Sequence, residues 1–215
     1  MNNTNIDFWE RIIRNPSDPY KDLFREEEAY LISNIAPDAS VLDIGCGDGR
    51  IIRLINQVNK NIIGIDNDAI AIEDAKKQLG DLDGVQLMEA DAFNLPFNEG
   101  TFDVVTFMMT LVNFDENKLV ALKEIHRVLK DDGKLLLSVY SEDAADTRLS
   151  MYTEVGLPIK SMEKGKFVFD AMGSAGTSEQ FSEEELKSLA ESTGFKITDC
   201  KKVDKIAYMC TLQKA

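Results

Sequence analysis

The sequence contains few of the residues that build metal centres and disulfide frameworks. Its 215 residues include one histidine, His126, and three cysteines, Cys46, Cys200 and Cys210, with no C-x-x-C spacing. An odd number of cysteines without that spacing argues against a disulfide framework or a zinc site, and it fits a reducing compartment. We therefore expect no bound metal, unpaired cysteines and a cytoplasmic location.

Positive charge and long hydrophobic runs are also scarce. The 24 basic residues face 38 acidic ones, which gives a formal net charge of -14 with no dense basic stripe. Such a field repels phosphate backbones and anionic lipids, so a small or cationic partner fits better than nucleic acid or a membrane. No run of eighteen apolar residues and no apolar leader is present, so neither a membrane span nor a signal peptide is expected.

Hydrophobic residues make up 44% of the chain, which is enough to bury a sizeable core. Apolar strand-like runs alternate with amphipathic segments of helical period. Strands are expected at 40–44, 61–66, 85–90, 101–109 and 134–140, and helices at 20–35, 50–58, 68–79 and from Asp115 to Gly133. Alternation at this spacing predicts an α/β fold with a doubly wound, mostly parallel, Rossmann-like sheet of seven strands.

We expect a single domain with four parts. Residues 1–36 form an N-terminal helical cap, 37–140 the cofactor-binding core, 141–180 an insertion or lid, and 181–215 the last helix and edge strands. The insertion contains a possible helix near 146–155, a strand-like stretch at 166–170 and a flexible stretch at 173–180. Ser182 and Glu185 form a capping box for the last helix, and two antiparallel strands follow at one sheet edge.

The segment "VLDIGCGDGR" at 41–50 carries the main functional signal. Its glycines follow the first strand, at the carboxyl edge where open α/β sheets bind ligands. A dinucleotide fingerprint starting at Gly45 would require a third glycine at position 50, where Arg50 stands. Asp48 at the helix start would also oppose a pyrophosphate. The loop therefore favours a ligand with positive groups.

Acids at the ends of the next two strands indicate what else the ligand contains. Asp66 ends the second strand, where a carboxylate can accept hydrogen bonds from ribose hydroxyls. Asp91, Ala92 and Phe93 follow the third strand and could hold an adenine ring by its amino group and faces. A nucleoside with a cationic tail and no pyrophosphate is S-adenosylmethionine.

With these residues the sequence resembles the class I S-adenosylmethionine-dependent methyltransferases, in the small-molecule branch related to the ubiquinone and menaquinone methyltransferases. The matching motifs are "VLDIGCGDGR", "GID", "EADAFNLPF", "FDVVTF", "EIHRVLKDDGKLLLS" and "FSEEELKSLAESTGF". Family members that methylate amides have an N-P-P-aromatic motif after the fourth strand. The sequence here is "MMTLVNF", which argues against an amide substrate.

The resemblance implies roles for individual residues. Asp43, Gly45, Cys46 and Gly47 would line the methionine moiety, Asp66 and Asn67 the ribose, Asp91, Ala92 and Phe93 the adenine, and Met109 and Leu111 the sulfonium side. Candidate substrate contacts are Tyr20, Phe24, Asn113, Tyr140, Met151 and Tyr152. Of these, Asn113 and Tyr140 are also weak catalytic candidates. Cys46 is interpreted as a small filler and His126 as a structural residue.

The implied function is transfer of a methyl group from S-adenosylmethionine to a small molecule. One alternative is a non-catalytic binder of S-adenosylmethionine or S-adenosylhomocysteine, and a second is an NAD(P)-dependent oxidoreductase, which Asp48 and Arg50 oppose. Methylation of a protein or nucleic acid stays possible, with nucleic acid the weaker of the two because of the acidity. The sequence leaves open the acceptor atom, a general base, and whether the protein is a monomer or a homodimer.

Overall fold

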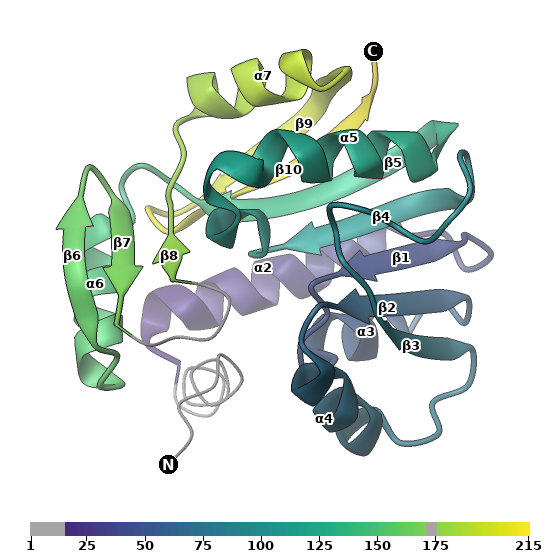
Figure 1. The fold of residues 1–215 in the computed structure, drawn as a ribbon, viewed down its shortest axis with the longest axis horizontal. Helices are drawn as coiled ribbons and strands as arrows, with labels where there is room; N and C mark the ends of the chain where they lie inside the picture. Colours follow the sequence, from purple (N-terminus) through teal and green to yellow (C-terminus); the bar gives the residue numbers. More distant parts are fainter. Residues whose placement is uncertain (1–15, 171–175) are drawn as a thin grey trace.

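The core of the protein is a seven-stranded sheet, shown edge to edge in Figure 1. The computed structural model describes residues 16–170 and 176–215. The strand order is β3-β2-β1-β4-β5-β10-β9. The strands are β1 (Val41–Ile44), β2 (Ile62–Asp66), β3 (Val85–Glu89), β4 (Phe102–Met108), β5 (Leu129–Tyr140), β9 (Phe195–Val203) and β10 (Ala207–Lys214). β1 to β5 pair in parallel, and β10 pairs antiparallel with β5 and β9. The predicted Rossmann-like sheet is confirmed.

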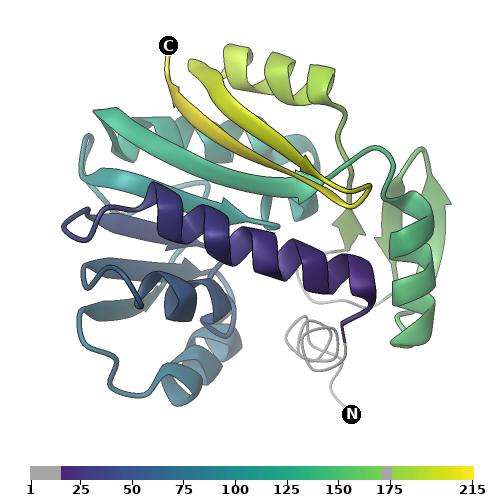
Figure 2. The same cartoon turned by 180° about the vertical axis from the view of Figure 1, so that it is seen from behind.

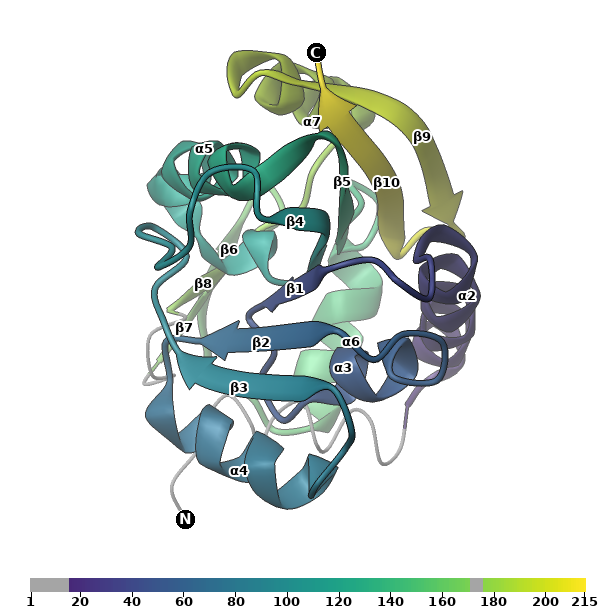
Figure 3. The ribbon, with the colours of Figure 1, turned by 90° about the vertical axis from the view of Figure 1, so that its right-hand side faces the viewer.

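Helices cover both faces of this sheet. They are α2 (Asp18–Asn34), α3 (Arg50–Ile55), α4 (Ala69–Leu79), α5 (Lys118–Val128) and α7 (Glu183–Ser192). Figure 3 shows α2 and α3 on one face and α5 and α7 on the other, and Figure 2 shows α2 lying across its face. Among the described residues, no helix is long and apolar enough to span a membrane. Because both faces are covered, β4 and β5 are buried along most of their length.

The cap signals in the sequence place two helix starts correctly. The Asp68 side chain accepts a hydrogen bond from the Ile70 N–H at the start of α4. Ser182 and Glu185 form the expected capping box at the start of α7. Each cap satisfies backbone N–H groups that the first turn of a helix leaves without partners.

Residues 145–170 and 176–178 build a small unit beyond the carboxyl ends of the parallel strands (Figure 1). It contains α6 (Ala145–Glu154) and a three-stranded sheet of β6 (Ile159–Glu163), β7 (Lys166–Phe169) and β8 (Thr177–Ser178). The expected helix and the strand at 166–170 correspond to α6 and β7, whereas β6 and β8 were not expected. Residues 173–175 of the expected flexible stretch, like residues 1–15 of the expected cap, lie outside the described residues.

The predicted helix from Asp115 to Gly133 is wrong at both ends. A 3-10 turn (Asp115–Asn117) precedes α5, which begins at Lys118 and ends at Val128. Leu129 already has extended backbone angles and pairs with Phe102, so β5 starts there. Gly133 lies inside the strand, where an added Cβ would come within 3.1 Å of the Phe102 carbonyl oxygen. Close strand packing, and not a helix end, therefore explains this glycine. α3 is also shorter than the expected 50–58, because the chain turns after Ile55.

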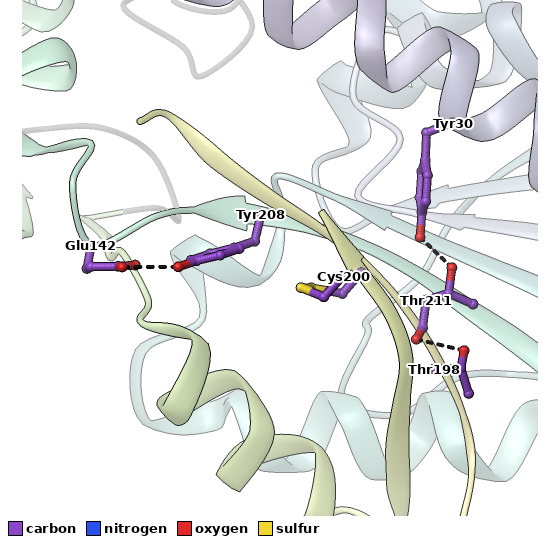
Figure 4. Close-up of a disulfide and its surroundings, with 7 residues drawn as sticks. Tyr30, Glu142, Thr198, Cys200, Tyr208 and Thr211 are labelled. Carbon is purple, nitrogen blue, oxygen red and sulfur yellow. Dashed lines mark hydrogen bonds between the residues drawn. A yellow bond between two sulfur atoms is a disulfide. The ribbon is translucent and has the colours of Figure 1, made fainter. Parts of the chain in front are cut away.

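The expectation that the cysteines are unpaired is wrong for two of the three. Cys200 on β9 and Cys210 on β10 form a disulfide (Figure 4), and only Cys46 is a free cysteine. The antiparallel register places Cys200 directly opposite Cys210, with their Cα atoms 4.0 Å apart. A spacing of ten residues carries no such signal in the sequence, because the pairing follows from where the hairpin turns.

Candidate functional site

A cavity of about 510 Å³ lies at the carboxyl ends of the parallel strands, under the small unit of residues 145–170 and 176–178. One end is lined by the glycine loop after β1 and by the ends of β2 and β3. The other end is lined by the segment after β4, the end of β5, and the small unit. The first end contains Gly45, Cys46, Gly47, Asp66, Asn67, Asp91, Ala92 and Phe93, all expected cofactor residues. These residues, far apart in sequence, are brought together because parallel strands end at one edge.

The glycine loop turns sharply and leaves space for a ligand. Gly45 and Gly47 have φ angles of +71° and +52°, a region that residues with a side chain rarely adopt. A Cβ at Gly45 would lie 2.4 Å from the Thr110 side chain, so this glycine permits close packing between β1 and the segment after β4. A Cβ at Gly47 would meet no atom within 4 Å. Gly47 therefore keeps open a part of the cavity.

Asp66 fixes the loop and still offers acceptors to the cavity. Its Oδ2 accepts a hydrogen bond from the Gly47 N–H at 3.0 Å, and its Oδ1 accepts one from the Asp68 N–H at 3.0 Å. Each carboxylate oxygen has a second lone pair, so Asp66 can accept two further hydrogen bonds. Burial raises the pKa of Asp66, and the two backbone N–H groups act against that rise. Asp91 is exposed, and its Oδ1 accepts from the Phe93 N–H at 2.9 Å.

Asp43 is not in the cavity wall, although it was expected to line the methionine moiety. It is buried beneath the loop, where its Oδ1 accepts a hydrogen bond from the Thr106 hydroxyl at 2.6 Å and its Oδ2 has no partner. Burial raises the pKa of Asp43 to about 7, while Thr106 and the nearby Arg50 act to lower it. Asp43 therefore supports the loop from below and is mainly protonated below about pH 7.

The titration of Asp43 predicts a pH effect on stability. Its pKa of about 7 lies above the ordinary value of 3.8, so the folded protein holds this proton between about pH 4 and pH 7 while the unfolded chain releases it. Asp43 therefore favours folding at acid pH, and this contribution is lost as pH rises through about 7. At most it amounts to about 4 kcal/mol.

We expect the replacement D43N, which can keep the Thr106 contact, to remove this dependence. The free energy of unfolding should be measured by urea denaturation of both proteins at pH 5 and at pH 7.5. The wild type should lose stability relative to D43N as pH rises. Parallel pH profiles of the two proteins would contradict a protonated Asp43.

Glu27 and Arg50 form a charged contact under the same loop, and sequence reasoning missed Glu27. The Glu27 side chain on α2 is fully buried, and its Oε2 lies 2.7 Å from Nη1 of Arg50, whose side chain is 22% exposed. Its Oε1 accepts a hydrogen bond from the Ser138 hydroxyl at 3.2 Å. The signal was available, because Glu27 falls at helical spacing on a stripe whose other members are Tyr20, Leu23, Tyr30 and Leu31. A lone acid on an apolar stripe indicates a buried partner.

The other end of the cavity contains three of the expected substrate contacts. Asn113, Tyr140 and Tyr152 line it, as does Met109, which has a φ angle of +53°. Phe114, Asp115, Asn117, Leu157, Phe169 and Thr177 also line it and were not expected. Most of these come from the small unit and from the 3-10 turns after β4, where the sequence has no periodic pattern. This end combines aromatic side chains with a similar number of polar ones.

Four other expected residues lie behind the cavity wall. Leu111, Tyr20 and Met151 are buried, and Phe24 is packed against Arg50, whose Cζ lies 4.8 Å from the ring centroid. Tyr20 is one contact away from the cavity, because its hydroxyl donates to the Tyr140 hydroxyl at 3.0 Å. Their apolar or aromatic character reflects packing, which sequence alone cannot separate from ligand contact.

Cys46 and His126 have surroundings that fit the roles expected for them. Burial raises the pKa of the Cys46 thiol well above its ordinary value, and Asp43 and Asp66 act in the same direction, so the thiolate is disfavoured. His126 packs against Phe195, with ring centroids 5.1 Å apart, and is not among the cavity-lining residues.

The sheet order and the acidic glycine-loop site together define a class of protein. A β3-β2-β1-β4-β5-β10-β9 sheet with acids after β1, β2 and β3 is the arrangement expected for the class I fold that binds S-adenosylmethionine. A family profile described as "Methyltransferase domain" matches residues 42–137, which include this end of the site. This match supports the class I S-adenosylmethionine-dependent methyltransferases as the family of this chain, in the branch related to the menaquinone methyltransferases.

Individual relatives show how far the similarity extends. A demethylmenaquinone methyltransferase of Staphylococcus aureus is 33% identical over 162 residues, which are 72% of this chain and 66% of that protein. Other curated relatives align over 106 to 116 residues, so the chain spans about half the length of the first curated relatives it matches.

Solved structures show the same fold over nearly the whole chain. The PH0226 protein of Pyrococcus horikoshii has a TM-score of 0.75 at 23% identity and covers 99% of this chain and 94% of that one. A Burkholderia thailandensis 1,6-didemethyltoxoflavin-N1-methyltransferase with bound S-adenosylhomocysteine has a TM-score of 0.68 at 19% identity, covering 98% and 87%.

Proposed function

We propose that the protein is an enzyme that transfers a methyl group from S-adenosylmethionine to a small-molecule acceptor. The observation that carries this is the cavity end where open space at Gly47 meets the acceptor oxygens of Asp66 and Asp91. The branch, whose relatives include demethylmenaquinone methyltransferases, supports a small acceptor. A cytoplasmic location stays a prediction, which the Cys200–Cys210 disulfide does not support.

The residues at the glycine-loop end fit the cofactor. Asp66 would accept hydrogen bonds from the ribose hydroxyls, Asp91 and Phe93 would hold the adenine, and the loop from Gly45 to Gly47 would surround the methionine part. The cofactor supplies an electrophilic methyl group on sulfur. The chain's contribution is to align the acceptor with that methyl group and to keep water away, which lowers the barrier chiefly by orientation.

We expect the replacement D66A to weaken binding of S-adenosylhomocysteine by about 1 to 3 kcal/mol, because two ribose hydrogen bonds are lost. Isothermal titration calorimetry measures this directly. D74A is a matched control, since Asp74 is an acid on α4 whose partner is the exposed Lys77 and which is not among the cavity-lining residues. Equal affinity of wild type and D66A would contradict the assignment.

The alternatives predict different results in the same assays. A nicotinamide oxidoreductase should bind NAD(H) or NADP(H), whereas our proposal predicts a thermal shift with S-adenosylhomocysteine and none with these dinucleotides. A non-catalytic binder should give no labelled product from methyl-labelled S-adenosylmethionine. Separating an extract into small molecules, protein and nucleic acid would show which fraction accepts the methyl group, and we expect the small molecules.

A further inference from the structure

Arg148 on α6 is a buried cation whose hydrogen-bond partners among the described residues are all neutral. Its side chain is fully buried, and all five of its N–H groups are used. Nε donates to the Tyr152 hydroxyl at 3.2 Å, Nη1 to the Gly165 carbonyl at 3.0 Å and to Gln180 Oε1 at 3.4 Å, and Nη2 to the Ser178 carbonyl at 2.9 Å and its hydroxyl at 2.8 Å. Within the described residues, none of its acceptors is a carboxylate.

Aromatic rings hold the guanidinium of Arg148 directly behind the cavity wall. Its Cζ lies 4.1 Å from the ring centroid of Tyr140 and 4.5 Å from that of Phe167. Tyr140, Tyr152 and Ser178, which all contact Arg148, line the cavity. One layer of side chains therefore separates the positive charge from the cavity, and a charge buried in this way is screened less than one in water.

The other charges at this end of the cavity balance one another. Asp115 lies 2.5 Å from the Lys166 ammonium, which is also 3.5 Å from Glu179, and Lys118 pairs with Glu179. These two acids and two lysines sum to zero, and among the described residues Arg148 adds a positive charge that has no carboxylate partner. The glycine-loop end has the opposite character, because Asp48, Asp66, Asp68 and Asp91 line it while Arg50 is paired with Glu27. The cavity is therefore negative at one end and positive at the other.

Tyr140 presents a hydrogen-bond donor at the positive end. Its hydroxyl accepts from the Tyr20 hydroxyl, so its own O–H is left to donate toward the cavity that it lines. Burial raises the pKa of Tyr140 well above its ordinary value, with Arg148 acting in the other direction, so the phenol keeps its proton. A neutral phenol held over a guanidinium is a strong donor to an anionic oxygen.

We propose that the acceptor end of the cavity selects a small molecule bound as an oxyanion, with Tyr140 donating a hydrogen bond to that oxygen and Arg148 acting behind it as a positioning residue. This rests on the proposed methyltransferase function, because it assigns the second substrate of the same cavity. The same field disfavours a cationic amine as acceptor. Carboxylates and phenolates share the required chemistry, and the experiment distinguishes them.

The test uses protein saturated with S-adenosylhomocysteine, so that the cofactor's own positive sulfur does not contribute. The probes are 4-nitrophenol, whose ionisation is read by absorbance, 4-nitrobenzoate, and the neutral 4-nitroaniline. We expect the bound nitrophenol to ionise about 1 pH unit or more below its value in water, equivalent to about tenfold stronger binding of the anion than of the neutral phenol. Tighter binding of 4-nitrobenzoate would instead identify the oxyanion as a carboxylate.

The variants R148M and Y140F should each reduce this preference for the anion about tenfold, and R148K, which keeps the charge, should restore part of it. Y208F is the matched control. It also removes one hydroxyl hydrogen bond, which Tyr208 donates to Glu142 at 3.0 Å, but neither residue lines the cavity. Y140F preserves the packing if R148M disturbs α6. If Arg148 and Tyr140 had a purely structural role, the variants would bind less nitrophenol, but the pH at which the bound nitrophenol ionises would not change.

Three results would overturn the proposal. They are equal binding of nitroaniline and the two anions, tighter binding of nitroaniline, and an ionisation shift that persists in both R148M and Y140F. Binding of S-adenosylhomocysteine, measured by calorimetry, distinguishes failure of the proposed function from failure of the acceptor assignment. If the wild type does not bind it, the proposed function fails. If it binds normally while the anion preference is absent, only the assignment of the acceptor fails.

Discussion

A leucine at position 47 is expected to abolish binding of S-adenosylhomocysteine while the protein stays folded. A Cβ at Gly47 would meet nothing within 4 Å, and the residue lines the cavity, so the larger side chain would occupy the ligand's space. Affinity should fall by at least about 100-fold, which corresponds to about 2.7 kcal/mol of lost contacts. Calorimetry gives the affinity, and urea denaturation gives the remaining stability.

The control for G47L is G100L. Gly100 has a φ angle of +64°, similar to the +52° of Gly47, and its added Cβ would also meet nothing within 4 Å, but Gly100 is not among the cavity-lining residues. Both variants should lose about 1 to 2 kcal/mol from placing a side chain in the left-handed region. Only G47L should lose the ligand. Full binding by G47L would show that the open space at Gly47 is not the ligand's place.

Removing Arg50 is expected to cause the largest loss of stability among the charged residues around the site. In R50A the fully buried Glu27 keeps its hydrogen bond from Ser138 but loses the one cation that pairs with it among residues 16–170 and 176–215. Breaking a buried ion pair by removing one partner costs about 3 to 5 kcal/mol. The free energy of unfolding in urea measures this loss.

Two further variants show whether that loss comes from the buried charge. R25A removes an arginine that pairs on α2 with Asp22, but both side chains are more than half exposed, so it should cost about 0.2 to 1 kcal/mol. The double variant E27L/R50L removes both charges and should recover most of the stability lost in R50A. If R50A and R25A lose the same amount, the Glu27–Arg50 contact is not the cause.

The parts of this protein that sequence predicts are those set by local pattern. Alternating apolar periods gave the order of strands and helices, and Asp68 and Ser182 marked helix starts, because caps depend on residues within one turn. That Gly45, Gly47, Asp66 and Asp91 line one end of a cavity could be predicted, since each lies at or just after the end of a strand. Parallel strands then bring these places together without further information.

The parts that sequence missed depend on contacts between distant segments. Glu27 and Arg148 each sit on an apolar helix stripe, and neither their partners nor their position relative to the cavity can be read from neighbouring residues. The Cys200–Cys210 pair depends on the register of a hairpin. Leu157 and Phe169 line the cavity from the loop before β6 and from the end of β7, and the sequence does not show how these segments pack relative to the parallel sheet.

The place of β10 in the sheet has a consequence for synthesis on the ribosome. β10 follows both β5 and β9 in the chain, yet it lies between them in the sheet and pairs with β5 from Ala207 to Gln213. Until residues 207–214 leave the exit tunnel, one edge of β5 has no neighbour, and Tyr30 on α2 lacks Thr211, its hydrogen-bond partner at 2.6 Å. An open strand edge is a site for pairing with other chains. Nascent chains that stop short of β10 should therefore need chaperones, whereas chains that extend through β10 can close the sheet themselves.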